Sequence, residues 1–153
     1  MSIVERVLPR QIDNSFNGHR LALWLLAALI ALRLLMSINS IVNTESVAVG
    51  ADRIPLDSYG PAAARTVLML FASTALGQLA LTLIAFTALI RYRTLVPFIF
   101  VVLIAEHLAR RSLVQSYAIE RADGASPGWY INLAILTVMA VGLVLSLRRA
   151  RRP

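Results

Sequence analysis

Hydrophobic residues occur in four long blocks, which cover residues 20–42, 65–90, 95–117 and 129–147. An α-helix rises about 1.5 Å per residue, so about 20 apolar residues cross a bilayer core that is roughly 30 Å thick. Each block is long enough for one such crossing. The pattern therefore predicts an all-α fold, an integral membrane four-helix bundle, in which residues 1–153 form a single membrane domain.

The polar stretches between the blocks differ in length. Residues 43–64 separate the first two blocks, and we predict that they form a long outer loop, either a lid over the bundle or a disordered surface loop. Residues 91–94 form a connection so short that the second and third helices must be antiparallel neighbours. Residues 3–8 have the pattern of a short amphipathic turn at the membrane surface, and a loose tail is the alternative.

The composition of the chain agrees with a membrane location. Hydrophobic residues make up 58% of the chain and the mean hydropathy is +0.72, whereas soluble domains are roughly 45–50% apolar. The net charge of +7 does not indicate nucleic acid as a partner, because the positive residues gather at the ends of the hydrophobic blocks. Positive charge in that position sets the orientation of a membrane protein.

The distribution of arginine predicts an N-in/C-in orientation. Residues 1–20, 91–94 and 148–153 together carry nine arginines. The opposite side carries Arg53, Arg65 and Arg121, together with five acidic residues. By the positive-inside rule, both termini should be cytoplasmic, in a multi-pass protein that we expect in a bacterial inner membrane.

Two missing residue types exclude several kinds of chemistry. The chain contains no cysteine, which excludes disulfides, thiolate zinc sites and cysteine nucleophiles. It also contains no lysine, because all fifteen basic residues are arginine, and this excludes a retinal or pyridoxal Schiff base. The two histidines, His19 and His107, are expected at different depths, so we predict no metal site within one chain. The cofactor remains unknown.

Ionic and amide side chains interrupt the hydrophobic blocks and mark the candidate site. They are Arg33 in the first block, Gln78 in the second, and Glu106, His107, Arg110 and Arg111 in the third. A charge inside a bilayer is costly and usually has a function. From the rise of a helix, these side chains fall in the middle or the outer half of the bundle, where they can converge.

The helical phase of the third block divides its polar residues into two rows. Glu106 and Arg110 share one face and are expected to form an i,i+4 ion pair. Arg33 either becomes a second partner of Glu106 or extends to the outer headgroups. His107 and Arg111 form the neighbouring row, and Arg111 borders the opposite face. That opposite face, which we expect to contact lipid, contains Val101, Leu108 and Ser112.

Small and weakly polar residues predict how the helices pack. Two pairs of small residues spaced by four permit close helix contact. They are Ser73 with Gly77 and Gly142 with Ser146. Thr74, Gln78 and Thr82 form a polar stripe on the second helix. The two hydroxyl groups can donate to their own backbone, whereas the Gln78 amide needs a partner on another helix.

Three classes of function follow from the polar residues. Three arginines share the region with one carboxylate, and this excess of positive charge favours an anionic ligand. We expect a small polytopic membrane protein that binds or conducts an anionic or lipid-like ligand, a quinone or a small anion. The binding residues would be Arg33, Gln78, Glu106, His107, Arg110 and Arg111. The alternative is a structural or assembly subunit of a larger membrane complex, or of a homo-oligomer. A third class, which the sequence favours less, is a lipid-modifying enzyme with His107 or Glu106 as base.

Overall fold

The chain folds into helices throughout the part that the structure describes, residues 3–117 and 128–148 of a computed structural model. The α-helices are α1 (Ile3–Val7), α2 (Arg20–Val42), α3 (Thr44–Gly50), α4 (Pro61–Arg91), α5 (Val96–Ser116) and α6 (Gly128–Leu147), and the 3-10 helices are η1 (Leu56–Ser58) and η2 (Arg93–Leu95). No strand occurs in these ranges, so the predicted all-α fold is confirmed. The polar loop predicted before the fourth block, and Arg149, Arg151 and Arg152, lie outside the described residues.

Three of the described helices are long and apolar enough to cross a membrane. They are α2, α4 and residues Tyr130–Leu147 of α6, which fits a multi-pass membrane protein. Helix α5 has 21 residues, but it contains Glu106, Arg110 and Arg111. Because of these charges, α5 is not among the helices that are apolar enough to cross a membrane. Its bounds nevertheless agree with the third predicted block.

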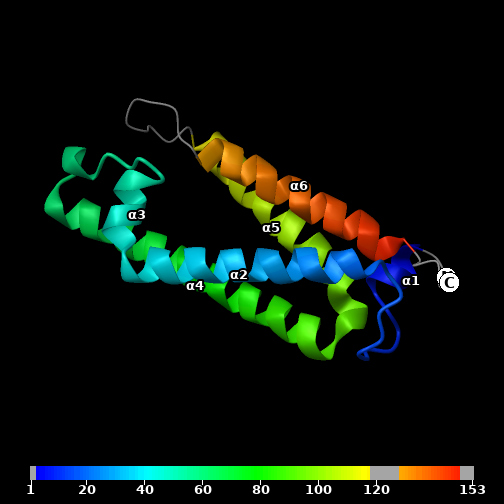
Figure 1. Cartoon of the computed structure of the whole chain (residues 1–153). Coiled ribbons are helices and arrows are strands. Elements are labelled where there is room, and N and C mark those ends of the chain that lie inside the picture. The colour runs from blue at the N-terminus through cyan, green and yellow to red at the C-terminus, as the bar shows by residue number, and fades with distance from the viewer. Residues whose placement is uncertain (1–2, 118–127, 149–153) are drawn as a thin grey trace.

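The long helices form two pairs that meet at one end of the molecule. Helix α2 packs along α4 and against α6, and α5 packs along α6. We call the end with α1, residues 92–95 and the last turn of α6 the closed end, and the end with α3 and the first turn of α4 the open end. The α2/α4 and α5/α6 pairs approach each other at the closed end and diverge toward the open end (Figure 1).

The short connection joins α4 and α5 at the closed end, but it does not make them the main packing partners of each other. The sequence predicted that they would be neighbours because only residues 91–94 were expected between them. In the structure α4 packs mainly on α2, and α5 packs mainly on α6. The buried face of α4 consists of small side chains, which allow α2 to approach closely. These residues are Ala75, Thr82, Ala85 and Ala88.

The apolar core occupies the closed half of the bundle. Its largest fully buried side chains include Phe100 and Leu103 from α5, Leu26 from α2 and Met139 from α6. A Cβ atom added to Gly142 would lie 2.3 Å from Cζ of Phe100, so the ring packs directly against the α6 backbone. The close packing predicted at Gly142 is therefore confirmed.

The pair Ser73 and Gly77 does not mediate close packing within the chain. Ser73 is exposed, and a Cβ atom added to Gly77 would meet nothing within 4 Å. The sequence pattern identified a small-residue face on α4, but α2 packs on a different small-residue face of the same helix. The Ser73–Gly77 face is left without a helix partner in the described structure.

The N-terminal segment, residues 3–19, covers the closed end. The Arg6 guanidinium donates from Nη1 to the Leu147 carbonyl oxygen at 3.0 Å, and the His19 backbone N–H donates to the Leu145 carbonyl oxygen at 3.1 Å. These bonds satisfy carbonyl groups in the last turn of α6, which have no partner inside that helix. The predicted amphipathic turn is thus an ordered helix, α1, and the segment joins the two ends of the chain.

The prediction that residues 43–64 form an outer loop is wrong, because helices occupy most of this segment. Helix α3 follows α2 after the single residue Asn43, η1 comes next, and α4 already begins at Pro61. Ala48 and Leu56 are buried, so the segment packs onto the ends of α2 and α4. Pro61 occupies the first turn of α4, where its missing N–H is not needed.

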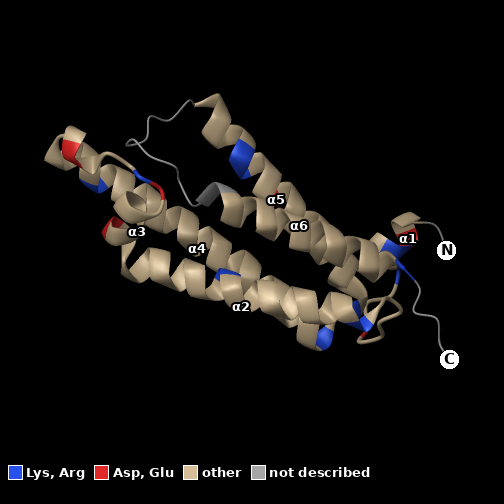
Figure 2. Ribbon diagram, turned by 45° about the horizontal axis from the view of Figure 1, so that its top comes forward, with Lys and Arg blue, Asp and Glu red and all other residues tan. Residues whose placement is uncertain are grey.

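The charged residues have a clear distribution over this fold. Arginines gather at the closed end around α1 and the α4–α5 connection, where α1 also carries an acidic residue, whereas acidic and basic residues lie together near α3 at the open end (Figure 2). Basic residues also interrupt α2 and α5 within their length (Figure 2). These interruptions are Arg33 on α2 and Arg110 and Arg111 on α5, and they lead to the candidate site.

Candidate functional site

Arg33 connects α2 to α5 through a buried ion pair. The residue is only 8% exposed, and its Nη2 donates to Oε2 of Glu106 at 2.7 Å. The sequence left open whether Arg33 would pair with Glu106 or extend to the outer headgroups. In the structure Arg33 pairs with Glu106.

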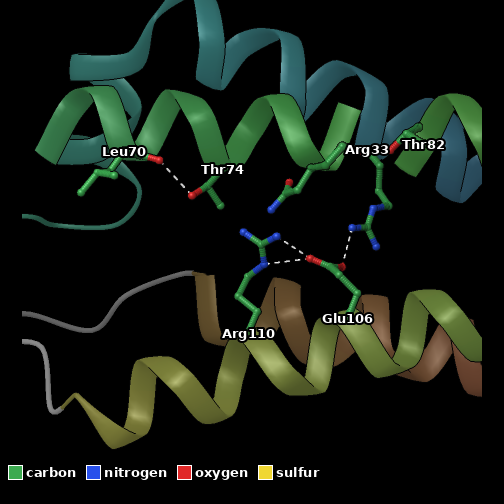
Figure 3. A network of polar contacts seen from close by, with 7 residues as sticks. Arg33, Leu70, Thr74, Thr82, Glu106 and Arg110 are labelled. Carbon is green, nitrogen blue, oxygen red and sulfur yellow. Dashed lines mark hydrogen bonds and ion pairs between the residues drawn. The ribbon is translucent and has the colours of Figure 1, made fainter. Parts of the chain in front are cut away.

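Arg110 binds the second oxygen of the same carboxylate. Its Nε donates to Oε1 of Glu106 at 3.0 Å, and its Nη2 donates to the same atom. The predicted i,i+4 pair is therefore present. Both carboxylate oxygens accept from a guanidinium, one from each side (Figure 3).

Gln78 brings α4 into the same network. Its amide is assigned with the oxygen toward Arg110, because in this orientation the oxygen accepts from Nη1 at 2.5 Å and from Nη2 at 2.9 Å. The expectation that this amide faces another helix is thus met. Arg33, Gln78, Glu106 and Arg110, which we call the charged cluster, connect α2, α4 and α5.

The charged cluster lies at the edge of the apolar core. On α2 the buried Ile30 precedes Arg33 by three residues, and on α5 the buried Leu103 precedes Glu106 by three. Side chains on a helix lean toward its N-terminus, and both α2 and α5 begin at the closed end. Arg33 and Arg110 therefore lean toward the core and away from the open end. The cluster stands where the two helix pairs begin to diverge.

The hydroxyl groups near the cluster are satisfied locally. Thr74 donates to the Leu70 carbonyl oxygen at 2.9 Å, and Thr82 donates to the Gln78 carbonyl oxygen at 2.7 Å. Of the predicted polar stripe on α4, only Gln78 joins the cluster. Ser37 differs, because it is 1% exposed and its Oγ has no partner in the described structure. It lies one turn beyond Arg33 on α2.

His107 and Arg111 do not join the charged cluster. Neither forms a hydrogen bond or ion pair with another residue in the described parts of the chain. At 100° per residue, both lie within about 20° of Phe100 on the α5 helix, and Phe100 packs against Gly142 of α6. His107 and Arg111, the second row of polar residues on α5, therefore face α6. Both side chains are half-buried, whereas the predicted lipid-facing residues Val101, Leu108 and Ser112 are exposed.

The cluster carries one unbalanced positive charge. Two guanidinium groups share the single carboxylate of Glu106, and the Arg110 side chain is 38% exposed. Because both oxygens of Glu106 accept from arginines, the carboxylate is placed as a counter-ion and not as a base. In the described residues, no three His, Cys, Asp or Glu side chains gather as a possible metal site. The chemistry that this arrangement offers is recognition of an anion.

Comparison with known proteins adds no relative. No protein-family model matches the chain, and no curated protein and no solved structure match it significantly.

Proposed function

We propose that the chain is a small membrane protein with four spans that binds an anionic, lipid-like ligand at the charged cluster. One observation carries the proposal: Arg33 and Arg110 share a single carboxylate at the point where the helix pairs diverge. Arg110 is the more exposed of the two arginines and is therefore the residue that contacts the ligand.

The path of the chain supports the proposal that α5 also spans the membrane, which makes four spans in all. The hydrogen bond between Arg6 and Leu147 holds α1 and the last turn of α6 at the same end. Helices α2, α4, α5 and α6 therefore cross the bundle alternately in opposite directions, and α5 runs beside α6 over its length. With α6 crossing a bilayer, α5 crosses it as well.

The arginine distribution supports the orientation. Arg6, Arg10, Arg20, Arg91 and Arg93 lie at the closed end, whereas acidic side chains accompany Arg53 and Arg65 near the open end. By the positive-inside rule the closed end and both termini face the cytoplasm. We propose a bacterial inner membrane as its location.

The energetic argument favours an anion over a neutral ligand. Two unit charges about 4 Å apart interact by about 4 kcal/mol at an effective dielectric constant of about 20. Exposure of Arg110 lowers this figure in the isolated protein. In a bilayer, however, an uncompensated guanidinium is costly. A ligand that supplies one negative charge completes the pairing of both arginines.

The proposal can be tested by thermal unfolding in a neutral detergent. The probes are phosphatidylglycerol, oleate and inorganic phosphate, with phosphatidylcholine as the uncharged reference. At least one anion should raise the Tm of the wild type and leave that of Arg110→Ala unchanged. Arg65→Ala, which removes an exposed arginine outside the cluster, should behave like the wild type. If no anion stabilises the wild type more than phosphatidylcholine does, the proposal fails.

A second candidate is a structural or assembly subunit, and the Ser73–Gly77 face of α4 favours it. Small residues on that face have nothing packed on them in the described structure, and such faces commonly contact another transmembrane helix. Because the chain has no native cysteine, Gly77→Cys is a clean probe for cross-linking in membranes. Val101→Cys, on the exposed face of α5, is the matched control. Efficient cross-linking only at residue 77 would support assembly.

The enzyme class, with His107 or Glu106 as a base for a lipid substrate, has the least support. Glu106 is held on both oxygens, and His107 is not oriented by a hydrogen bond within the described residues. Turnover of a lipid substrate that is lost in His107→Ala would favour this class.

A further inference from the structure

We infer that the protein binds the headgroup of an anionic phospholipid in a hollow at the closed end, where the N-terminal segment meets the last turn of α4. The hollow has a volume of about 320 Å³ and is lined by Asn14, Ile90, Arg91 and Tyr92. None of these residues belongs to the charged cluster. The site therefore goes beyond the proposed function, and it requires only that α4 crosses the membrane.

Hydrogen bonds between distant parts of the chain hold the walls of the hollow together. Thr94 Oγ1 donates to the Asp13 carbonyl oxygen at 2.9 Å and accepts from the Asp13 backbone N–H at 3.1 Å. Asn14 follows Asp13 directly, and Tyr92 lies two residues before Thr94, between α4 and η2. Two segments that are 81 residues apart in the sequence thus form one hollow.

Three polar side chains that line the hollow have unused hydrogen-bond donors. Within the described residues, the Arg91 guanidinium, the Asn14 amide and the Tyr92 hydroxyl form no hydrogen bond or ion pair. Arg93 differs, because its Nε donates to the Leu89 carbonyl oxygen at 3.1 Å and satisfies the end of α4. Arg91 is therefore the arginine of this connection whose whole guanidinium is available to a ligand.

The donors around the hollow favour a phosphate group. A guanidinium offers five N–H donors, an amide two and a phenol one, and a phosphate supplies several acceptor oxygens together with a negative charge. The carboxylate of Asp13, next to Asn14 in the sequence, accepts from the hydroxyl and the backbone N–H of Ser15. It forms no ion pair with Arg91 in the described structure, so the positive charge at the hollow is not neutralised.

The position of the hollow selects a lipid phosphate over a phosphate in solution. Helix α4 is long and apolar enough to cross a membrane, and Arg91 is its last residue. Arginines at the end of a membrane-crossing helix lie at the level of the lipid headgroups and attract acidic ones. Ile90, which is 54% exposed, adds an apolar wall on the membrane side of Arg91. The phosphate therefore lies at the membrane surface, and the acyl chains extend from it into the bilayer beside α4.

The two neighbouring arginines favour an acidic headgroup over a zwitterionic one. Phosphatidylcholine has the same phosphate, but its choline is a cation that accepts no hydrogen bond and is repelled by Arg91 and Arg93. The glycerol hydroxyls of phosphatidylglycerol can accept from Asn14 or Tyr92. We expect a preference for phosphatidylglycerol of about tenfold, of which about fivefold comes from the charge of Arg91 and the rest from hydrogen bonding.

The test measures the quenching of a single tryptophan by brominated lipids, with the 153-residue chain in vesicles. Both native tryptophans are replaced by phenylalanine. Thr87→Trp then places the reporter four residues before Arg91, on the same face of α4 and outside the lining of the hollow. Vesicles that contain brominated phosphatidylglycerol with plain phosphatidylcholine, and the reverse pair, give the relative affinity of the two lipids beside the reporter.

The variants separate charge from hydrogen bonding. Arg91→Gln should lower the preference at the reporter from about tenfold to about twofold. Asn14→Leu combined with Tyr92→Phe keeps the charge and should lower the preference to about fivefold. Undiminished preference in Arg91→Gln overturns the inference. If Arg91→Gln does not reconstitute, the charge-neutral double variant decides alone, and undiminished preference there overturns the inference as well.

Trp24 provides the matched control. Arg20 and Trp24 are also four residues apart on one face of a helix, at the closed end of α2, and Trp24 is 74% exposed. Neither residue lines the hollow. A protein that keeps only Trp24 should report at most the preference of about fivefold that charge alone provides. Equal preference at the two reporters would mean a general attraction to the basic end, and would overturn the inference.

Two further measurements identify the source of the phosphate and the site that binds it. Replacing chloride by inorganic phosphate at equal ionic strength should leave the preference at the reporter unchanged, and its loss would assign the hollow to a soluble anion instead. Arg110→Ala removes the ligand contact of the proposed function and should also leave the preference unchanged. A loss in Arg110→Ala would mean that the reporter senses lipid at the charged cluster, so the two sites can succeed or fail separately.

Discussion

The closed and open halves of this bundle are held together by different forces. In the closed half, apolar side chains from α2, α4, α5 and α6 form the core that contains Phe100 and Leu103, and the N-terminal segment covers the end. At the edge of the open half, α5 is linked to α2 and α4 by polar contacts, namely the ion pairs of Glu106 with Arg33 and Arg110 and the hydrogen bond between Gln78 and Arg110. The boundary between packing and charge lies at Arg33 on α2 and Glu106 on α5.

This difference has a physical basis. Helices in a membrane associate through van der Waals packing and through hydrogen bonds between helices, because lipid is as apolar as their side chains. The closed half uses the first of these and the charged cluster the second. A packed core needs no ligand to be complete, whereas a cluster with an unbalanced charge is stabilised by one. The closed half is therefore held by packing, and the edge of the open half by the charged cluster, where the proposed function places the ligand.

The largest effect is expected from removing the carboxylate at the boundary. Glu106→Gln leaves two guanidinium groups facing each other, and breaking a buried ion pair from one side costs about 3–5 kcal/mol. Glu106 is 23% exposed, so we expect the lower end, about 3 kcal/mol. The measurement is the unfolding midpoint in mixed micelles of dodecyl maltoside and SDS. Glu45→Gln, an exposed carboxylate on α3, should change little.

A double substitution sharpens this prediction. Glu106→Gln alone leaves two positive charges in the cluster, and adding Arg110→Gln lowers this to one, on Arg33. The double variant should therefore be more stable than Glu106→Gln alone. A double-mutant cycle in which the effects of Glu106→Gln and Arg110→Gln on stability simply add would show that Glu106 and Arg110 are not coupled. The cluster would then not hold the open half together.

The next largest effect is expected from a comparison of two glycines, one packed against another helix and one without a packed neighbour. A Cβ atom at position 142 would clash with the buried Phe100 ring, so Gly142→Ala should lower the free energy of unfolding by about 1–3 kcal/mol. A Cβ atom at position 77 meets nothing. Gly77→Ala should raise helix stability by up to about 1 kcal/mol. Thermal unfolding in the same detergent compares the two, and equal losses would contradict the assignment of packing to the closed half.

Much of the fold could be predicted from the sequence because it follows from properties of single helices. The bounds of α2, Arg20–Val42, agree with the first hydrophobic block. The Glu106–Arg110 pair followed from helical phase because both residues belong to one helix. The partner of Arg33 was left open, because it depends on how α2 docks on α5, and that docking is set by contacts of the whole core.

The errors have equally specific causes. Helix α3 has seven residues, and a helix so short depends on tertiary packing, here at the buried Ala48. The spacing of Ser73 and Gly77 shows that α4 has a small-residue face but not which helix packs on it, and α4 has a second such face around Ala85. In each case the missing information lies in the arrangement of helices and not in any one of them.

A smaller effect is expected where the N-terminal segment meets the α4–α5 connection. Thr94 Oγ1 donates to the Asp13 carbonyl oxygen at 2.9 Å and accepts from the Asp13 backbone N–H at 3.1 Å. Thr94→Val removes both bonds while keeping the shape of the side chain. We expect a loss of about 1 kcal/mol and faster amide exchange in residues 10–19. Thr87→Val, which removes an exposed hydroxyl that bonds only within α4, is the control and should leave exchange in that segment unchanged.

The smallest effect concerns the pH dependence of the same segment. The Ser15 hydroxyl and its backbone N–H both donate to Oδ1 of Asp13, and these bonds hold the pKa of the Asp13 carboxyl below its usual value of 3.8. Because the folded pKa is the lower one, the turn is stabilised above the unfolded pKa, and this contribution is lost as the pH falls through the folded pKa.

Comparison of wild type with Ser15→Ala isolates this contribution. The two proteins should differ slightly in amide exchange of residues 10–19 at pH 6 and converge as the pH falls through the folded pKa of Asp13, once the carboxyl is protonated in both. Stability of the closed half should follow this titration only weakly, because the apolar core carries no ionisable group. A large loss of the whole fold in the same pH range would instead mean that the N-terminal segment, and not the core around Phe100, holds the closed half together.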